Sequence, residues 1–189
     1  MMSDRERPPL RLIRCSRSPA IIGTVRVGIA SPDDVAPVDA VVLEEDTWLI
    51  LSADPEVTIS HEHPVRLMTR LLEAQPLPTG TVFVRQGVPL TLVAVVHDFG
   101  AEPCCRPEWV AAALTEILRI CRERKLHSLQ LPLLGVRHGR LTTATVLPLL
   151  VRALSDEAQG GPKLVRLIVP PEAVVEVRRG LIASSRPDI

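Results

Sequence analysis

The sequence predicts an α/β fold, a sandwich of helices around a mixed β-sheet. Three observations indicate this class. Strand-like and helix-like segments alternate in the second half of the chain, residues 90–99 are apolar on both faces as in a central strand, and residues 107–124 carry an apolar face at helical spacing. Because 189 residues show no linker or repeat, we expect one domain over residues 9–189 after a disordered tail over residues 1–8.

The first half of the chain is predicted to be mainly β-structure. Apolar and polar residues alternate in its early segments, as they do in half-exposed strands, and a helix is expected between prolines that can start and stop it. In order, the expected elements are an edge strand over 10–14, strands over 21–29 and 38–42, a strand or loop entry over 48–51, and a helix over 64–72.

The second half carries the clearer signals. The helix over 107–124 starts with a proline and ends among basic residues, and a second helix over 143–156 follows two threonines that can cap it. Strands are expected over 80–84, 90–99 and 164–169, and a closing helix over 171–182. Between the two long helices, an apolar run from Leu129 to Leu134 reads as a buried strand that ends at a glycine.

The loop after this buried strand is the best candidate site. In an open α/β sheet, ligands bind at the carboxyl ends of strands, and the start of a helix there favours anions. Two arginines of the loop can hold a phosphate in bidentate fashion, although a solvated basic loop explains the same residues equally well. The loop consists of Gly135, Val136, Arg137, His138, Gly139 and Arg140.

The composition excludes several classes of function. Lys and Arg balance Asp and Glu at 22 each, and only 2% of the residues are aromatic, so we expect neither nucleic-acid binding nor a base-stacking platform. No apolar run has the length of a secretion signal or a membrane span, which favours a cytoplasmic protein without a membrane partner. The four cysteines are expected to be free thiols, and the role of the adjacent pair Cys104 and Cys105 stays open.

Two further groups of residues are candidate sites. His97 closes the central strand and can line the same cleft as the basic loop, but a strand-end histidine satisfied by hydrogen bonds is the simpler interpretation. His61 and His63 make a two-ligand metal set if Cys104 or Cys105 converges on them, which spacing alone does not indicate. We therefore expect no metal and no cofactor, and no nucleophile–base pair stands out.

Several segments resemble the macro domain, a three-layer α/β/α fold with a mixed central sheet. Val38-Asp39-Ala40-Val41-Val42 is similar to the family's V-D-A-I-V strand. Residues 80–82 and 92–97 are similar to its G-x-A and V-I-H segments, and residues 129–141 to its strand and second phosphate loop. The resemblance spans residues 21–170. It implies ADP-ribose binding, with ADP-ribosyl hydrolysis in some members.

The departures from the family pattern predict a rebuilt cleft. The family's N-A-A-N reads Leu43-Glu44-Glu45-Asp46, so that Asp46 alone stands in for a polar ligand group. The acidic adenine contact falls on Ile29, unless Asp33 or Asp34 replaces it. The glycine-rich first phosphate loop is missing, and two glutamates near a diphosphate repel it.

These observations lead to three hypotheses. The first is a macro-like protein that binds a nucleotide-type or other phosphorylated small molecule, such as ADP-ribose, through Asp46, His97 and the 135–140 loop. The alternative is a non-catalytic interaction module that keeps the fold and has lost the ligand, and an ADP-ribosyl hydrolase is the third. A homodimer is a further expectation, because residues 10–13 form a predicted exposed edge.

Overall fold

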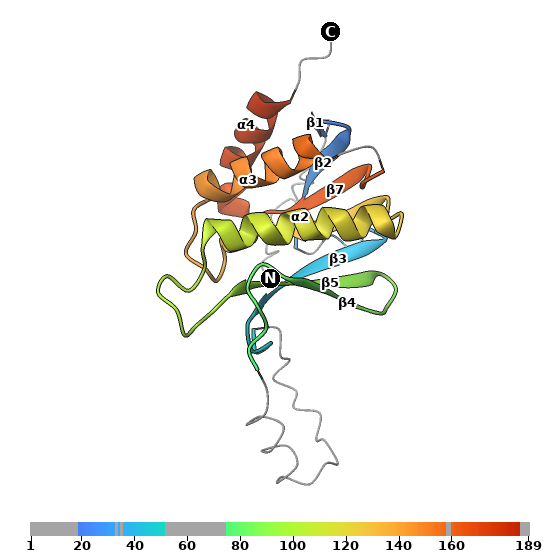
Figure 1. The fold of residues 1–189 in the computed structure, drawn as a ribbon. Coiled ribbons are helices and arrows are strands. Elements are labelled where there is room, and N and C mark those ends of the chain that lie inside the picture. Colours follow the sequence, from blue (N-terminus) through green and yellow to red (C-terminus); the bar gives the residue numbers. More distant parts are fainter. Residues whose placement is uncertain (1–18, 33, 35, 52–74, 158–159, 186–189) are drawn as a thin grey trace, which may run out of the picture.

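The computed structural model describes residues 19–32, 34, 36–51, 75–157 and 160–185 (Figure 1). Along the chain these residues form β1 (Ala20–Ile22), β2 (Val25–Ala30), β3 (Ala40–Asp46), β4 (Val82–Arg85), β5 (Leu90–His97), α2 (Pro107–Glu123), β6 (Ser128–Pro132), α3 (Thr143–Asp156), β7 (Leu164–Ile168), the 3-10 turn η1 (Pro171–Ala173) and α4 (Val174–Ser184). The predicted tail over 1–8, the edge strand over 10–14 and the helix over 64–72 lie outside the described residues.

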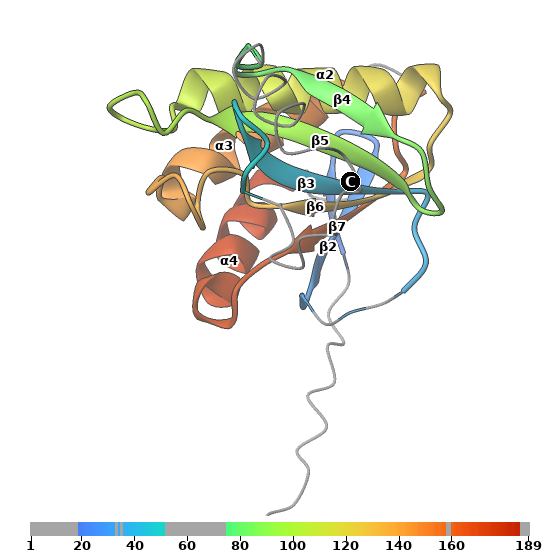
Figure 2. The same cartoon turned by 90° about the horizontal axis from the view of Figure 1, so that it is seen from below.

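In the described part of the chain, seven strands form one mixed sheet in the order β1-β2-β7-β6-β3-β5-β4. The five central strands run parallel, and β1 and β4 pair antiparallel with their neighbours at the two edges. Figure 2 shows how the sheet twists from β4 to β2. The predicted mixed sheet is confirmed, and the carboxyl ends of five parallel strands meet along one rim, where such sheets bind ligands.

The helices form the crossovers that parallel strands require. α2 connects β5 to β6, α3 connects β6 to β7, and α3 packs between α2 and α4. Figure 1 shows α2 and α3 running across the strands on one side of the sheet. Alternate residues of β6 and β7 point into this layer and are buried, namely Leu129, Leu131, Val165 and Leu167. The opposite sides of the same strands carry half-exposed residues, so the two faces of the sheet differ in chemistry.

The second-half predictions match the structure closely. α3 begins and ends where the spacing predicts, and the Thr142 side chain accepts the N–H of Thr145 as its N-cap at 3.2 Å. α2 begins at its predicted proline and ends one residue earlier than expected, at Glu123. The closing helix differs at both ends, because its first turn is the separate 3-10 turn η1 and its last residue is Ser184, two residues beyond the predicted end.

One early strand prediction is wrong in a specific way. The segment predicted as one strand over 21–29 is a hairpin, with β1 and β2 joined at Gly23. Gly23 adopts φ +60°, in the left-handed region that favours glycine, and a Cβ there would lie 3.0 Å from the Leu154 carbonyl oxygen of α3. The turn therefore packs against α3. The alternation of apolar and polar residues along 21–29 cannot predict this contact, because α3 is distant in the sequence.

One other boundary also moves. β3 extends four residues beyond its predicted end at Val42, through Glu44 and Glu45 to Asp46. Of the two alternatives for residues 48–51, a strand or a loop entry, the loop is confirmed. The Asp46 carboxylate at the end of β3 binds the backbone N–H groups of this loop.

Candidate functional site

A cleft of about 650 Å³ opens at the carboxyl ends of the parallel strands, and we call it the carboxyl-end cleft. This volume is in the range of small-molecule sites. Its walls come from the ends of β3, β6 and β7 and from the loops that follow them. The lining residues are Pro32, Val42, Leu43, Glu44, Leu51, Gln130, Pro132, Leu133, Val136, Arg137, His138, Ile168, Pro170, Pro171 and Glu172.

The loop after β6 forms a compact turn at one side of the cleft. Gly135 has φ +78°, and its carbonyl accepts the N–H groups of Gly139 at 3.1 Å and Leu141 at 3.0 Å. A Cβ on Gly139 would lie 2.4 Å from the Cβ of buried Cys105, so only glycine fits at this contact. The turn presents the exposed residues Arg137 and His138 to the cleft.

Three backbone N–H groups of this loop have no hydrogen-bond partner among the described residues, those of Arg137, His138 and Arg140. The N–H of Val136 donates to Leu133, that of Gly135 to Glu44 and that of Gly139 to Gly135. Consecutive free N–H groups in a turn form a concave site for anions. Because Arg137 lines the same cleft, this side of it is suited to a phosphate.

Glu44 ties the end of β3 to this loop. Its side chain is only 8% exposed, and its Oε1 accepts the Gly135 N–H at 3.1 Å while pairing with Nε2 of His97. The His97 ring is buried, stacks on Phe99 at a centroid separation of 5.9 Å and meets His138 edge-on at 6.2 Å. His97 therefore contacts two lining residues, Glu44 and His138, but does not line the cleft itself.

Asp46 is buried and fully engaged with backbone. Its carboxylate accepts the N–H groups of Trp48 at 2.7 Å, Ile50 at 2.7 Å and Leu51 at 2.8 Å. Glu45, also buried, turns its carboxylate toward the Leu51 N–H at 3.1 Å. These two carboxylates shape the loop after β3, and neither lines the cleft. Of the two adjacent glutamates, Glu44 is the one that lines it.

The predicted site residues thus separate into two groups. Val136, Arg137 and His138 line the cleft, while buried Gly135 and Gly139 shape their loop. Arg140 is exposed on that loop but does not line the cleft. The N-terminus of α3, which follows the loop, does not line it either. The role of each residue toward a ligand stays a prediction.

Part of the lining was not among the predicted residues. Pro170, Pro171 and Glu172 follow β7 directly, so their position at the carboxyl end of a predicted strand was the available signal. Gln130 and Pro132 lie within β6 on the half-exposed side of the sheet. Of the predicted adenine contacts, Asp34 is paired with Arg166, Ile29 lies outside the cleft, and Asp33 is outside the described residues.

The cysteines of the described chain are free, and two of them are deeply buried. Burial, reinforced by the Glu44 charge, raises the pKa of the Cys105 thiol to about 12. Burial also raises the pKa of Cys121, in the core face of α2, to about 12. Both thiols therefore stay protonated at neutral pH and are poor nucleophiles and poor metal ligands.

No metal centre or membrane span is found within the described ranges. These residues contain no group of three or more His, Cys, Asp or Glu side chains that could hold an ion, and His61 and His63 lie outside them. None of the described helices has both the length and the apolar character needed to cross a bilayer. The segment predicted to mediate dimerisation, residues 10–13, is likewise outside the described residues.

Comparison with known proteins places the fold among the macrodomains. No family model matches the sequence, and no curated protein matches it. The fold is similar to the Oceanobacillus iheyensis macrodomain with ADP (TM-score 0.61, 19% identity, covering 86% of this chain and 94% of that chain). It is also similar to the Trypanosoma brucei macrodomain in complex with ADP-ribose (TM-score 0.60, 12% identity, covering 88% and 73%). The macrodomain of Thermus aquaticus DarG is a third match (TM-score 0.55, 20% identity, covering 76% and 98%).

Proposed function

From the macrodomain fold of this chain, we propose that the carboxyl-end cleft binds a phosphorylated, nucleotide-like small molecule such as ADP-ribose. The observation that carries the proposal is the cleft of about 650 Å³ with Arg137 and His138 in its lining. Two of the similar macrodomains hold ADP and ADP-ribose, which supports this ligand class. In the proposed complex a phosphate lies against the guanidinium of Arg137 and the free N–H groups of Arg137 and His138.

The part of the cleft at the end of β7 is suited to an apolar, flat group. Ile168, Pro170 and Pro171 line it together with Pro32, and Glu172 is the one charged residue of this segment in the lining. A nucleoside can pack its base against such a surface, because base and proline both present apolar faces. The proposal therefore gives the ligand an orientation, with its phosphates toward β6 and its base toward the end of β7.

The proposal is for binding and does not include catalysis. The ionisable groups of the lining are Glu44, Arg137, His138 and Glu172. Glu44 Oε1 is engaged with both Gly135 and His97, which leaves it poorly placed to take a proton from water. A general base and a nucleophile within reach of one another do not stand out in this lining.

Calorimetric titration with ADP-ribose tests the proposal. We expect the wild-type chain to bind at about micromolar affinity, about −8 kcal/mol, and Arg137→Ala to weaken binding by about tenfold or more. Arg140→Ala is the matched control, because it removes the same charge from the same loop outside the lining. No heat with up to millimolar ADP-ribose, or equal losses in the two variants, would refute the proposed site.

A second candidate function rests on a separate observation. Exposed apolar side chains gather in the loops at the carboxyl ends of β3 and β5, where Trp48 is 48%, Ile50 65% and Phe99 55% exposed. The two loops are joined by the Thr47 N–H, which donates to the His97 carbonyl at 2.9 Å. Such a patch favours a protein partner, as in an interaction module. Sedimentation of the wild type and of Ile50→Ser with Phe99→Ser tests a second copy as that partner, and unchanged sedimentation would exclude it.

A further inference from the structure

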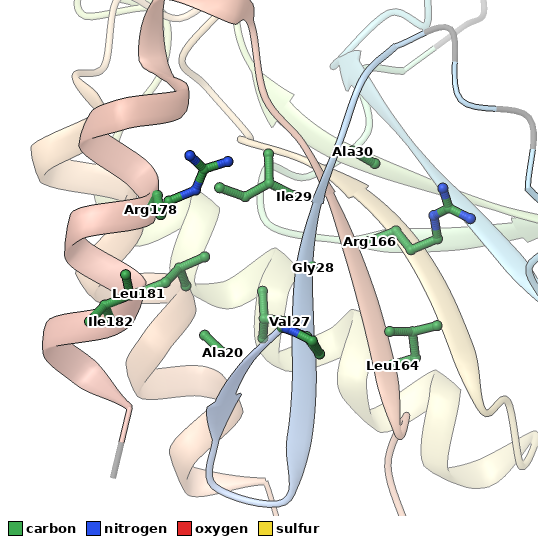
Figure 3. Close-up of a pocket in the computed structure, with 11 residues that line it drawn as sticks. Ala20, Val27, Gly28, Ile29, Ala30, Leu164, Arg166, Arg178, Leu181 and Ile182 are labelled. Atoms are coloured by element: carbon green, nitrogen blue, oxygen red, sulfur yellow. The ribbon is translucent and has the colours of Figure 1, made fainter. Parts of the chain in front are cut away.

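A second pocket lies near the β1–β2 edge of the sheet, between β2 and α4, and we call it the edge pocket (Figure 3). It has a volume of about 300 Å³, at the lower end of the range for small-molecule sites. It shares no lining residue with the carboxyl-end cleft. Its lining residues are Pro19, Ala20, Val27, Gly28, Ile29, Ala30, Leu164, Arg166, Arg178, Leu181 and Ile182.

The edge pocket exists because β1 is shorter than β2. The pairing of β1 with β2 ends at Ala20 and Val27, so in the described chain no strand flanks Gly28 to Ala30 on that side. Figure 3 shows α4 running alongside this uncovered part of β2. Ile29, on the α4 side of β2, is half-buried and extends into this space.

The walls of the edge pocket are apolar and firmly placed. Val27 and Leu181 are almost fully buried and form its base, while the accessible apolar surface comes from half-buried Ile29 and from Ile182, which is 64% exposed at the rim. A ligand that covers this surface removes apolar area from water at roughly 25 cal/mol per Å². The pocket therefore favours a compact apolar body.

The charges of the edge pocket are all positive. Its lining contains two arginines and no acidic residue. Arg166 is already paired with Asp34, and Figure 3 shows it on the far side of β7. Arg178 is half-buried on α4, extends toward Ile29, and forms no ion pair with any described residue. A half-buried guanidinium beside an apolar surface is complemented by a single anion.

We infer that the edge pocket is a second ligand site, for a small organic anion with an apolar body, of the carboxylate or sulfonate class. The apolar part lies against Ile29 and Ile182, and the acid group binds Arg178. This site is independent of the proposed nucleotide site, and its ligand differs in kind, with one charge and no requirement for a phosphate.

The probe for this inference is 8-anilinonaphthalene-1-sulfonate, whose fluorescence rises in apolar surroundings and which carries one sulfonate. N-phenyl-1-naphthylamine, which has the same rings without the sulfonate, is the uncharged counterpart. Both are titrated into the folded full chain, and Arg178→Gln is compared with Arg179→Gln. Arg179 is the matched control because it is exposed on the same helix outside the pocket lining.

We expect Arg178→Gln to weaken sulfonate binding by about tenfold or more and to leave binding of the uncharged dye unchanged. Ile182→Ser removes apolar surface from the rim of the pocket and should weaken binding of both dyes. The inference is overturned if sulfonate binding survives Arg178→Gln unchanged, or if Arg179→Gln weakens it equally. Thermal unfolding confirms that each variant is folded.

Discussion

The carboxylate of Glu44 accepts the backbone N–H of Gly135 at 3.1 Å, although 91 residues separate the two along the chain. This bond links the carboxyl end of β3 to the loop that carries Arg137. The same carboxylate oxygen pairs with buried His97, so three strand ends are joined at one atom. The Glu44 carboxylate therefore places a negative charge in the lining of the cleft, and this charge also holds neighbouring parts of the fold together.

Removing the Glu44 carboxylate should therefore destabilise the fold. We expect Glu44→Ala to lower the free energy of unfolding by about 1–3 kcal/mol, because it leaves the Gly135 N–H and the His97 ring without their partner. Glu44→Gln should cost less, since its amide oxygen still accepts. Urea unfolding measures both, with exposed Glu172→Gln as the control. Equal stability of Glu44→Ala and the control would contradict the structural role.

The same residue should also limit the affinity for a phosphorylated ligand. Glu44 lines the carboxyl-end cleft, and its charge repels an anion there. We expect Glu44→Gln to bind ADP-ribose several-fold more tightly than the wild type, with the difference largest at low salt. Calorimetric titration at two salt concentrations measures it. A weaker complex in Glu44→Gln would mean that the carboxylate accepts hydrogen bonds from the ligand.

Gly139 should not tolerate a side chain. Its Cβ would lie 2.4 Å from the Cβ of Cys105 and 2.7 Å from the Gly135 carbonyl oxygen, so Gly139→Ala has to displace backbone or core. We expect it to cost about 1–3 kcal/mol of unfolding free energy. Gly28→Ala is the comparison, because a Cβ there meets open space and the change should stay within about 1 kcal/mol. Similar costs for the two variants would show that the loop can relax.

Cys105 and Cys121 should resist thiol reagents in the folded protein. Burial raises the pKa of each thiol to about 12, so that almost no thiolate is present at pH 8. Iodoacetamide labelling followed by peptide mass spectrometry should leave both unmodified in buffer and modify both in urea. Rapid labelling of either residue without denaturant would show that the core around it opens.

Asp39 should make the stability depend on pH in the acid range. Its Oδ2 accepts the N–H groups of His127 at 2.7 Å and Ser128 at 2.8 Å, and these bonds lower its pKa below the model-compound value of 3.8. Because the folded pKa lies below the unfolded one, the contribution is complete above about pH 5 and is lost as the pH falls through 4 toward the folded pKa.

We expect Asp39→Asn to be less stable than the wild type near neutral pH and to show a flatter loss of stability below pH 5. Denaturant titrations across this range measure the slope. Asp156→Asn, at the exposed end of α3, removes a carboxylate that has only a 3.7 Å contact with Arg152 and serves as the control. Parallel slopes for Asp39→Asn and the wild type would exclude Asp39 as the titrating group.

The sequence alone determined those elements whose signals are local. The proline at the start of α2, the threonine cap of α3 and the apolar run of β5 predicted their elements closely, because capping and periodicity act within a few residues. The placing of a basic loop at the end of a buried strand followed in the same way. That rule also indicated the correct rim of the sheet for the cleft.

Only the tertiary structure decided which polar residues reach the cleft. Asp46 and Glu44 are two positions apart in one charged run. The Asp46 carboxylate accepts hydrogen bonds from backbone N–H groups of the next loop, whereas Glu44 lines the cleft and accepts the N–H of Gly135. The hairpin at Gly23 likewise depends on the approach of α3. A buried carboxylate needs donors, and the donors come from segments that only folding brings close, so no local pattern can identify them.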